Sequence, residues 1–376
     1  MAAIMAAIME ITENIMRRMR EPSTKLHNAL YFMSGMMVVI LALVIVAGVK
    51  TKAENAGFHI TDDTENSYEQ QVAGQTDTTQ DSGQEKWQEG VVAYQGKEYL
   101  YNTDIKTYLM MGVDINGPVQ QSSDYTQGGQ SDALFLLVVN NKTEQLQVIS
   151  INRNTMADIE LCDEEGIDMG PLKTQICLQH AFGDGKRLSC SKTVDAVSGL
   201  FQNIPISGYL AMNMGGIPQM NDAVGGVEVT VLQDISFPKA GVDLKKGEKV
   251  TLDGTQAYYY LHGRDTEEYD SATKRLQREE QYIVAYMDKL KKVSTENPDQ
   301  VTEIYNSVSD YLVTSVDFTS MIEQLMNYSF SEDQMYTVPG KTVEGEPIDG
   351  KRYEEYHVDE DAMEELIMKV FYTPVQ

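Results

Sequence analysis

The feature that most constrains this chain is a long stretch near its start that carries no charge. Residues 29–49 read ALYFMSGMMVVILALVIVAGV and include no acidic or basic side chain. A helix rising about 1.5 Å per residue over this run would cross the roughly 30 Å hydrocarbon core of a bilayer. A cleaved signal peptide has a shorter apolar region followed by a small-residue cleavage site, and a buried core helix is usually shorter and patterned. We therefore predict one transmembrane helix over 29–49.

The charges on either side of this run predict its orientation. Basic side chains precede it, at Arg17, Arg18, Arg20 and Lys25. After Lys50 and Lys52 acidic residues dominate. Because basic flanks stay on the cytoplasmic side, we expect a single-pass cell-membrane protein whose N-terminus is cytoplasmic and whose C-terminal part is extracytoplasmic.

The composition then divides the chain into four parts. Residues 1–28 would form a cytoplasmic tail ahead of the transmembrane helix at 29–49. Residues 50–90 are rich in Thr, Gln, Asp, Glu, Ser and Gly and have too few apolar side chains to fold, so they indicate an extracytoplasmic linker. Residues 91–376 have the composition of a globular domain, with its core expected over 105–295.

The charge balance limits the partners. The formal net charge is −27, whereas binding to phosphate backbones needs an excess of Lys and Arg on one face. We therefore predict no nucleic-acid partner, although a small basic pocket can exist inside an acidic surface. A role as a membrane-bound transcription regulator is also disfavoured, because the short cytoplasmic tail has no DNA-binding motif. The three cysteines allow at most one intramolecular disulfide, and the sequence does not choose the pair.

The globular part alternates strand and helix patterns. Strands are expected at 91–94 and 97–102 around a Gln95–Gly96 turn, and at 105–114, 132–140, 146–152, 208–213, 227–232, 249–254, 260–264, 333–340 and 353–358. Helices are expected at 174–185, 191–201, 271–293, 299–312, 317–328 and 360–371, with Ser191 or Thr193 as a possible cap. This mixture predicts an α/β or α+β layered sandwich with a central mixed β-sheet flanked by helices.

Two acidic residues stand at strand ends. Asp114 closes the apolar run MMGVD, and Asp132 opens the next run in QSDALF. Carboxylates brought together repel each other unless a cation lies between them, and hard oxygen ligands suit Mg²⁺ or Mn²⁺. The alternative is that each acid caps a turn, which is the more common role of a single Asp.

Several arginines follow. Arg153 ends the strand after Asp132, and Arg264 lies shortly before the long amphipathic helix. Arg275 and Arg278 are three residues apart on that helix and so share a face. Planar guanidinium groups bind phosphate bidentately. The alternative for the helix is a solvated face neutralised by neighbouring acids. His180 could likewise point into a site or be a satisfied core histidine.

Six segments in order resemble the LytR-CpsA-Psr family of bacterial cell-envelope phosphotransferases. They are YLMMGVD (108–114), SDALFLLVVNNKTEQLQVISINRNT (131–155), KTQICLQHAFGDG (173–185), NDAVGGVEVTV (221–231), LDGTQAYYYLHGRD (252–265) and RLQREEQYI (275–283). The resemblance extends over about residues 91 to 295, and a membrane anchor with a linker also fits the family.

The resemblance implies a site and a reaction. Family members have a layered α/β fold with a deep apolar groove for a polyprenyl lipid, arginines that hold its pyrophosphate, and acids that hold a divalent metal. Asp114 and Asp132 match the acids, which are candidates both to bind Mg²⁺ or Mn²⁺ and to accept the proton of an attacking hydroxyl. The matching basic residues are Arg153, Arg264, Arg275 and Arg278, with Lys173 where a basic residue often precedes HAFG. The implied reaction transfers a glycopolymer, such as teichoic acid or capsule, from an undecaprenyl-pyrophosphate carrier to peptidoglycan.

Three residues depart from the family pattern. Asn154 replaces an acid in the usual Arg-Asp-Thr, His262 replaces an arginine on the segment YLHGR, and Glu279 replaces the glutamine that usually follows Arg278. A negative charge at Glu279 would weaken pyrophosphate binding. The alternative function is therefore a non-catalytic relative that binds polyprenyl phosphates or wall polymer in envelope maintenance.

Overall fold

The computed structural model describes residues 90–264, 269–297, 300–316, 328–345 and 353–375. The predicted tail, transmembrane helix and linker lie outside these ranges, as does nearly all of the helix predicted at 317–328. Among the helices within the described ranges, none is long and apolar enough to cross a membrane.

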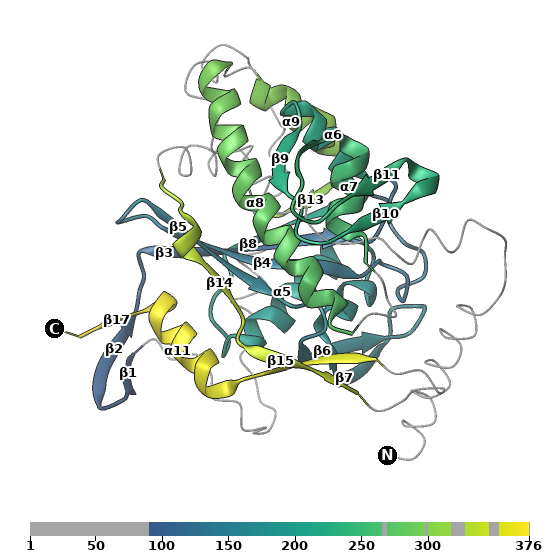
Figure 1. Cartoon of the computed structure of the whole chain (residues 1–376). Coiled ribbons are helices and arrows are strands. Elements are labelled where there is room, and N and C mark those ends of the chain that lie inside the picture. Colours follow the sequence, from purple (N-terminus) through teal and green to yellow (C-terminus); the bar gives the residue numbers. More distant parts are fainter. Residues whose placement is uncertain (1–89, 265–268, 298–299, 317–327, 346–352, 376) are drawn as a thin grey trace, which may run out of the picture.

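A six-stranded mixed sheet forms the centre of the domain (Figure 1). Its order is β13 (Leu312–Thr314), β8 (Gly208–Asn213), β3 (Ile105–Val113), β4 (Ser131–Asn140), β5 (Gln145–Ile151) and β14 (Met335–Thr337). β3 pairs parallel with β8 and antiparallel with β4, whereas β5 pairs antiparallel with β4 and parallel with β14. The predicted central mixed sheet is therefore confirmed.

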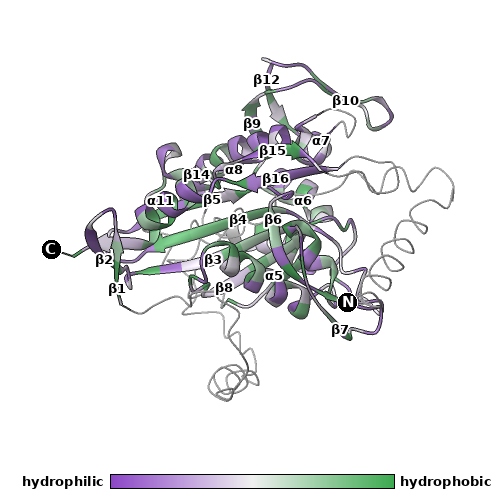
Figure 2. Ribbon diagram, turned by 90° about the horizontal axis from the view of Figure 1, so that it is seen from below, coloured by the Kyte–Doolittle hydropathy of each residue, from purple (hydrophilic) through white to green (hydrophobic). Residues whose placement is uncertain are grey.

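Helices cover the sheet on both faces, which explains its continuous apolar runs. Figure 2 shows α8 (Ser271–Glu296) on one side of strands β3 to β5 and α5 (Arg187–Leu200) on the other. The side chains of β4 are buried from Ser131 to Val139, with no exposed alternate positions. A strand that is covered on both faces needs apolar side chains at successive positions rather than at every second one.

The remaining strands form small antiparallel pairs around this sheet. β1 (Val91–Tyr94) and β2 (Lys97–Tyr101) form the predicted hairpin, and β17 (Tyr372–Pro374) adds to its edge. The other pairs are β6 (Met156–Cys162) with β7 (Asp168–Gln175), β9 (Val227–Thr230) with β12 (Lys249–Leu252), β10 (Ile235–Phe237) with β11 (Val242–Leu244), and β15 (Gly340–Glu344) with β16 (Glu354–Val358).

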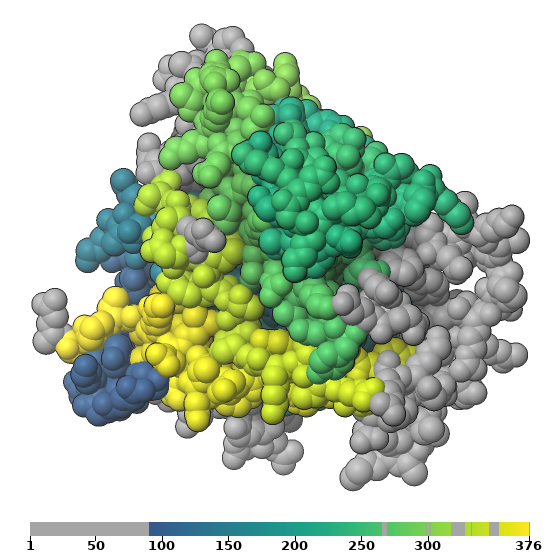
Figure 3. Space-filling model, viewed as in Figure 1, coloured from purple at the N-terminus to yellow at the C-terminus, as the bar shows by residue number. Residues whose placement is uncertain are grey.

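The other helices are short, apart from the last. The α-helices are α6 (Ile217–Ala223), α7 (Gly254–His262), α9 (Gln300–Val308) and α11 (Glu360–Phe371), and the 3₁₀ helices are η1 (Ile176–Ala181), η2 (Met214–Gly216), η3 (Pro238–Ala240), η4 (Ser309–Tyr311) and η5 (Glu332–Gln334). In the space-filling view of Figure 3 the C-terminal segment, coloured yellow, lies against α8 and covers part of this face.

Four local predictions are corrected. The segment YLHGR is not a strand, because α7 continues to His262 from a capping box in which Asp253 and Gln256 bond reciprocally. α5 begins at Arg187, so neither Ser191 nor Thr193 caps it, and the Thr193 hydroxyl instead donates to the Ser189 carbonyl at 2.8 Å. The helix predicted over 299–312 ends at Val308, and the 3₁₀ helix η4 then leads into β13. The helix predicted over 174–185 is only the 3₁₀ helix η1, because β7 continues to Gln175. The β6–β7 hairpin was not predicted.

Candidate active site

Strand register explains why an acid and an arginine stand at opposite ends of the segment from residue 131 to 155. In the antiparallel pair β4–β5, Leu134 lies opposite Ile151, so Asp132 and Arg153 arrive at the same end of the sheet. There Arg153 Nη1 lies 2.6 Å from Asp132 Oδ1. The two side chains are 10% and 5% exposed, so this ion pair is largely removed from water.

A second arginine binds the other side of the same carboxylate. Arg275 on α8 places Nη1 3.3 Å from Asp132 Oδ2, and its Nη2 donates to the Asp132 carbonyl at 2.9 Å. Asp132 is therefore held between two guanidinium groups that come from different layers of the fold. This arrangement joins the end of the sheet to the first turns of α8.

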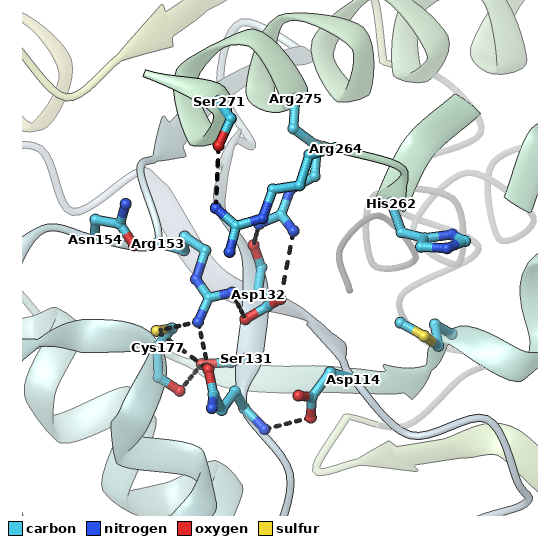
Figure 4. A network of polar contacts seen from close by, with 12 residues as sticks. Asp114, Ser131, Asp132, Arg153, Asn154, Cys177, His262, Arg264, Ser271 and Arg275 are labelled. Carbon is cyan, nitrogen blue, oxygen red and sulfur yellow. Dashed lines mark hydrogen bonds and ion pairs between the residues drawn. The ribbon is translucent and has the colours of Figure 1, made fainter. Parts of the chain in front are cut away.

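Arg264 completes the group that we call the arginine cluster, which consists of Arg153, Arg264 and Arg275. Figure 4 shows the three guanidinium groups gathered around Asp132. Arg264 Nη1 donates to the Ser271 hydroxyl at a long distance of 3.5 Å. The pKa of Arg264 is lowered to about 9, mainly by burial and to a smaller extent by repulsion from Arg153 and Arg275. Such crowding of positive charge is relieved by an anion, and phosphate oxygens match guanidinium geometry.

Asp114 lies at the same end of the sheet, directly after β3. Its Oδ1 accepts a hydrogen bond from the Gln130 N–H at 2.6 Å, and its own N–H donates to the Gln130 carbonyl at 3.0 Å. Burial and the nearby Asp132 carboxylate raise the pKa of Asp114 to about 7. The two predicted acids therefore do lie near each other, and Asp132 disfavours the charged form of Asp114.

The donor set around these acids is compatible with a metal ion only as a partial site. Within the described ranges, no group of three or more His, Cys, Asp and Glu side chains could hold a metal ion. Both oxygens of Asp132 already face arginines, at 2.6 and 3.3 Å. Mg²⁺ commonly takes one or two carboxylates and completes its shell with water and substrate phosphate. A metal ion at this pair of acids would need that smaller set of protein ligands.

Arg278 connects α7 to α8 through hydrogen bonds. Its Nε donates to the Tyr260 carbonyl at 2.6 Å, and its two Nη groups donate to the Gly263 carbonyl and to Gln233 Oε1. Lys173 is exposed on β7, where it faces Asp158 in the β6–β7 ladder, and no described contact joins its ammonium group to the arginines. The predicted phosphate roles of Arg278 and Lys173 stay predictions.

The three departures from the family pattern occupy different places. Asn154 is buried in a turn, where its carbonyl accepts from the Tyr356 N–H at 2.8 Å. His262 points away from the cluster in Figure 4 and packs against aromatic rings, and burial lowers its pKa to about 3. Glu279 is the departure that meets a cluster arginine, because its Oε1 lies 3.3 Å from Arg275 Nε.

Glu279 is nevertheless a weak anion in this setting. Its side chain is 1% exposed, and burial raises its pKa to about 8 even though Arg275 and Arg278 oppose the rise. A side chain with that pKa is mostly protonated near neutral pH. The expected repulsion of pyrophosphate by Glu279 is therefore smaller than the sequence alone suggests.

Two site residues were not anticipated. Gln130 and Cys177 both accept from Arg153 Nη2, Gln130 through Oε1 and Cys177 through Sγ at 3.0 Å. Gln130 stands two residues before Asp132, which was a signal in the sequence. Cys177 offered none, because it enters the site from η1. All three cysteines are buried and free, so no disulfide forms.

The fold and this site together define a class: an α/β protein that gathers buried arginines and acids at one end of a mixed sheet. The family model LytR_cpsA_psr matches residues 61–370, and the chain belongs to this family.

Individual relatives agree with that assignment. The chain is 30% identical over 231 residues to the polyisoprenyl-teichoic acid–peptidoglycan teichoic acid transferase TagU of Enterococcus faecalis, across 61% of this chain and 67% of the relative. It is 33% identical over 156 residues to the protein of the same name from Halalkalibacterium halodurans, across 42% and 44% of the two chains. The crystal structure of protein gbs0355 from Streptococcus agalactiae has the same fold, with a TM-score of 0.55, 21% identity, and coverage of 71% of this chain and 87% of that one.

Proposed function

We propose that this protein is a membrane-anchored extracytoplasmic transferase that moves a glycopolymer from an undecaprenyl-pyrophosphate carrier to a hydroxyl of peptidoglycan. The observation that carries the proposal is the arginine cluster around Asp132, which offers several guanidinium groups to one anion. The names of the relatives support the same reaction, because they are called teichoic acid transferases that act on peptidoglycan.

In the proposed reaction the acceptor hydroxyl attacks the phosphorus that carries the glycopolymer. A new phosphorus–oxygen bond forms to peptidoglycan, and the bond to the bridging oxygen of the pyrophosphate breaks. Polyprenyl phosphate leaves with that electron pair, and the hydroxyl proton passes to solvent. Little covalent chemistry is needed from the protein, since phosphoryl transfer depends mainly on positioning and charge stabilisation.

Arg153, Arg264 and Arg275 would supply that stabilisation. Their guanidinium groups come from the end of β5, the segment after α7 and α8, so one pyrophosphate could be held from three directions. Asp132 keeps Arg153 and Arg275 oriented when the site is empty of substrate. Because the side chains are already in place, little reorganisation accompanies the reaction, and such preorganised charges are the main source of rate enhancement.

Asp114 and Asp132 would hold a divalent metal ion, Mg²⁺ or Mn²⁺, in the same proposal. When bound, it would offset negative charge on the pyrophosphate oxygens. The support is the juxtaposition of the two acids, whose mutual repulsion contributes to the raised pKa of Asp114. With only these two carboxylates, the ion would depend on phosphate for part of its coordination shell.

The proposed location follows from the sequence. A transmembrane helix at 29–49 with basic residues before it would place the globular domain outside the cell, where lipid carrier and peptidoglycan meet. The predicted lipid groove belongs to the same proposal, and apolar side chains near the arginine cluster would contact the polyprenyl chain.

The proposal is tested on the hydrolytic form of the reaction, in which water replaces the acceptor hydroxyl and attacks the terminal phosphorus of undecaprenyl pyrophosphate. The full-length protein in detergent should then release undecaprenyl phosphate and inorganic phosphate, and the latter is followed with and without Mg²⁺ or Mn²⁺. We expect metal-dependent release that falls by about 100-fold or more in Arg153→Ala and Asp132→Ala. Tight binding without turnover, insensitive to metal, would instead support the non-catalytic receptor.

A further inference from the structure

Gln130 contacts both an acid and an arginine of the site. Its side-chain Oε1 accepts a hydrogen bond from Arg153 Nη2. Its backbone N–H donates to Asp114 Oδ1 at 2.6 Å, and its carbonyl accepts from the Asp114 N–H at 3.0 Å. One residue in the loop between β3 and β4 therefore links Arg153 to Asp114.

A buried histidine, His180, hydrogen-bonds to the loop that carries Gln130. His180 Nδ1 lies 3.1 Å from the Gly128 carbonyl oxygen and 3.0 Å from that of Gly129. Burial lowers the pKa of His180, so the ring is neutral, with Nδ1 donating to these carbonyls. The Cys190 thiol lies 3.7 Å from the other ring nitrogen, which is then an acceptor. His180 is thus a satisfied core histidine.

Two glycines make the close packing of this loop possible. A Cβ on Gly128 would lie 2.7 Å from the His180 carbonyl oxygen, and one on Gly129 would lie 2.8 Å from side-chain atoms of Val113 and Ile115. Gly129 also has a φ of +80°, a conformation that strains other residues. The backbone on which Gln130 stands therefore has little freedom to move.

We infer that Gln130 is a positioning residue that fixes Arg153 relative to Asp114, an inference that rests on the proposed function. Arg153 Nη1 pairs with Asp132 while Nη2 bonds to Gln130, so both ends of the planar guanidinium group are fixed. A neutral amide suits this position. A carboxylate would add negative charge beside Asp114 and Asp132, and an ammonium group would repel Arg153.

The test compares Gln130→Leu and Gln130→Glu with a matched control in the full-length protein. Leu keeps the bulk and the backbone bonds to Asp114 but removes the acceptor, whereas Glu keeps the acceptor and adds charge. Gln127→Leu is the control, because Gln127 is exposed in the same loop and makes no described side-chain hydrogen bond. Turnover of undecaprenyl pyrophosphate is measured as kcat and KM, with Tm as the check on folding.

We expect Gln130→Leu to lower kcat by about 10-fold to 100-fold, the range for losing a hydrogen bond to a charged group. Gln130→Glu should recover most of that kcat but raise KM, because its charge repels the anionic carrier. Equal loss of kcat in both Gln130 variants, with KM unchanged, would overturn the inference. Should Gln130→Leu not fold, Gln130→Asn, whose side chain is too short to reach Arg153, replaces it.

A double-mutant cycle identifies the partner through which Gln130 acts. If Gln130 acts through Arg153, Gln130→Leu should have little further effect on kcat or on affinity for inorganic pyrophosphate once Arg153 is Ala. Full additivity would contradict the inference. The same double-mutant cycle can also be measured as free energies of unfolding in urea, and that measurement needs no ligand. If the parent neither turns over nor binds pyrophosphate, the proposed function fails, while coupling in the unfolding cycle still decides whether Gln130 holds Arg153.

Discussion

At the scale of single residues, Asp132 is a buried charge that two arginines neutralise. Its carboxylate pairs with Arg153 and Arg275 in a site that is almost closed to water. Removing one member of a buried ion pair leaves uncompensated charge and typically costs about 3–5 kcal/mol. We expect Asp132→Asn to lower the free energy of unfolding in urea by about that amount.

A surface pair provides the control for this prediction. Asp104 and Lys142 form an ion pair at 3.6 Å whose side chains are 48% and 76% exposed. Asp104→Asn should change the free energy of unfolding by less than about 1 kcal/mol.

Inorganic pyrophosphate should stabilise Asp132→Asn more than it stabilises the parent protein, because the variant has more unbalanced arginine charge. An equal shift in both would contradict this reading.

Glu279 predicts how stability depends on pH. Its pKa in the folded protein is about 8, above the usual value of 4.5, so the folded state binds its proton more tightly than the unfolded state does. Its contribution is therefore fully present below pH 4.5 and is lost as pH rises through about 8. Glu279→Gln should match the parent at low pH and become increasingly more stable than it across this window. Unfolding at several pH values measures the difference, and a gap that does not change with pH would contradict the prediction.

Which residues the sequence could identify depended on how each reaches the site. Asp132 and Arg153 were predictable because a two-strand register brings them together. The raised pKa of Glu279 depends on burial in the folded protein, which no local sequence pattern reveals. Gln130 was missed because the contact of its side chain with Arg153 depends on the conformation of the loop that carries it, which no sequence pattern showed.

At the scale of elements, Arg278 and Arg264 allow a contrast between structure and binding. Arg278 bonds to the Tyr260 and Gly263 carbonyls and to Gln233, whereas Arg264 makes one long side-chain bond among the described contacts. Arg278→Met should therefore destabilise the protein by about 3 kcal/mol or more, since buried acceptors lose their donor.

Arg264→Met should instead affect ligand binding more than stability. It removes a charge that Arg153 and Arg275 repel, so stability should be unchanged or higher while affinity for inorganic pyrophosphate falls. Urea unfolding and calorimetric titration of both variants provide the comparison. The proposed division fails if Arg264→Met destabilises the protein as much as Arg278→Met does.

Elements with a strong apolar period were predicted well. β3, β4, β5 and α8 match their expected ranges closely, because burial on both faces of the sheet or on one face of a long helix leaves a clear pattern. The segment YLHGR was misassigned because its few apolar positions fit a strand as well as a helix, and the capping box at Asp253 decided the outcome. The β6–β7 hairpin alternates buried and exposed positions along β6, a signal that was present but not used.

At the scale of the whole molecule, the predicted anchor has a direct consequence. If residues 29–49 form the anchor, deleting them should move the protein from the membrane fraction to the soluble fraction. In intact cells stripped of their wall, protease should digest the domain after residue 50 and leave a tag on residues 1–28 protected. Digestion of the tag instead would reverse the proposed orientation.

The central claim is that the protein transfers glycopolymer from a pyrophosphate carrier to peptidoglycan, and that the arginine cluster around Asp132 binds the pyrophosphate. Its most direct test is to incubate the full-length protein in detergent with undecaprenyl-pyrophosphate-linked teichoic acid and peptidoglycan, and to measure polymer covalently attached to the wall. We predict attachment by the parent and by Gln127→Leu, and at least about 100-fold less by Arg153→Ala and Arg275→Ala. Attachment that persists in both arginine variants, or none by the parent under any metal condition, would contradict the claim.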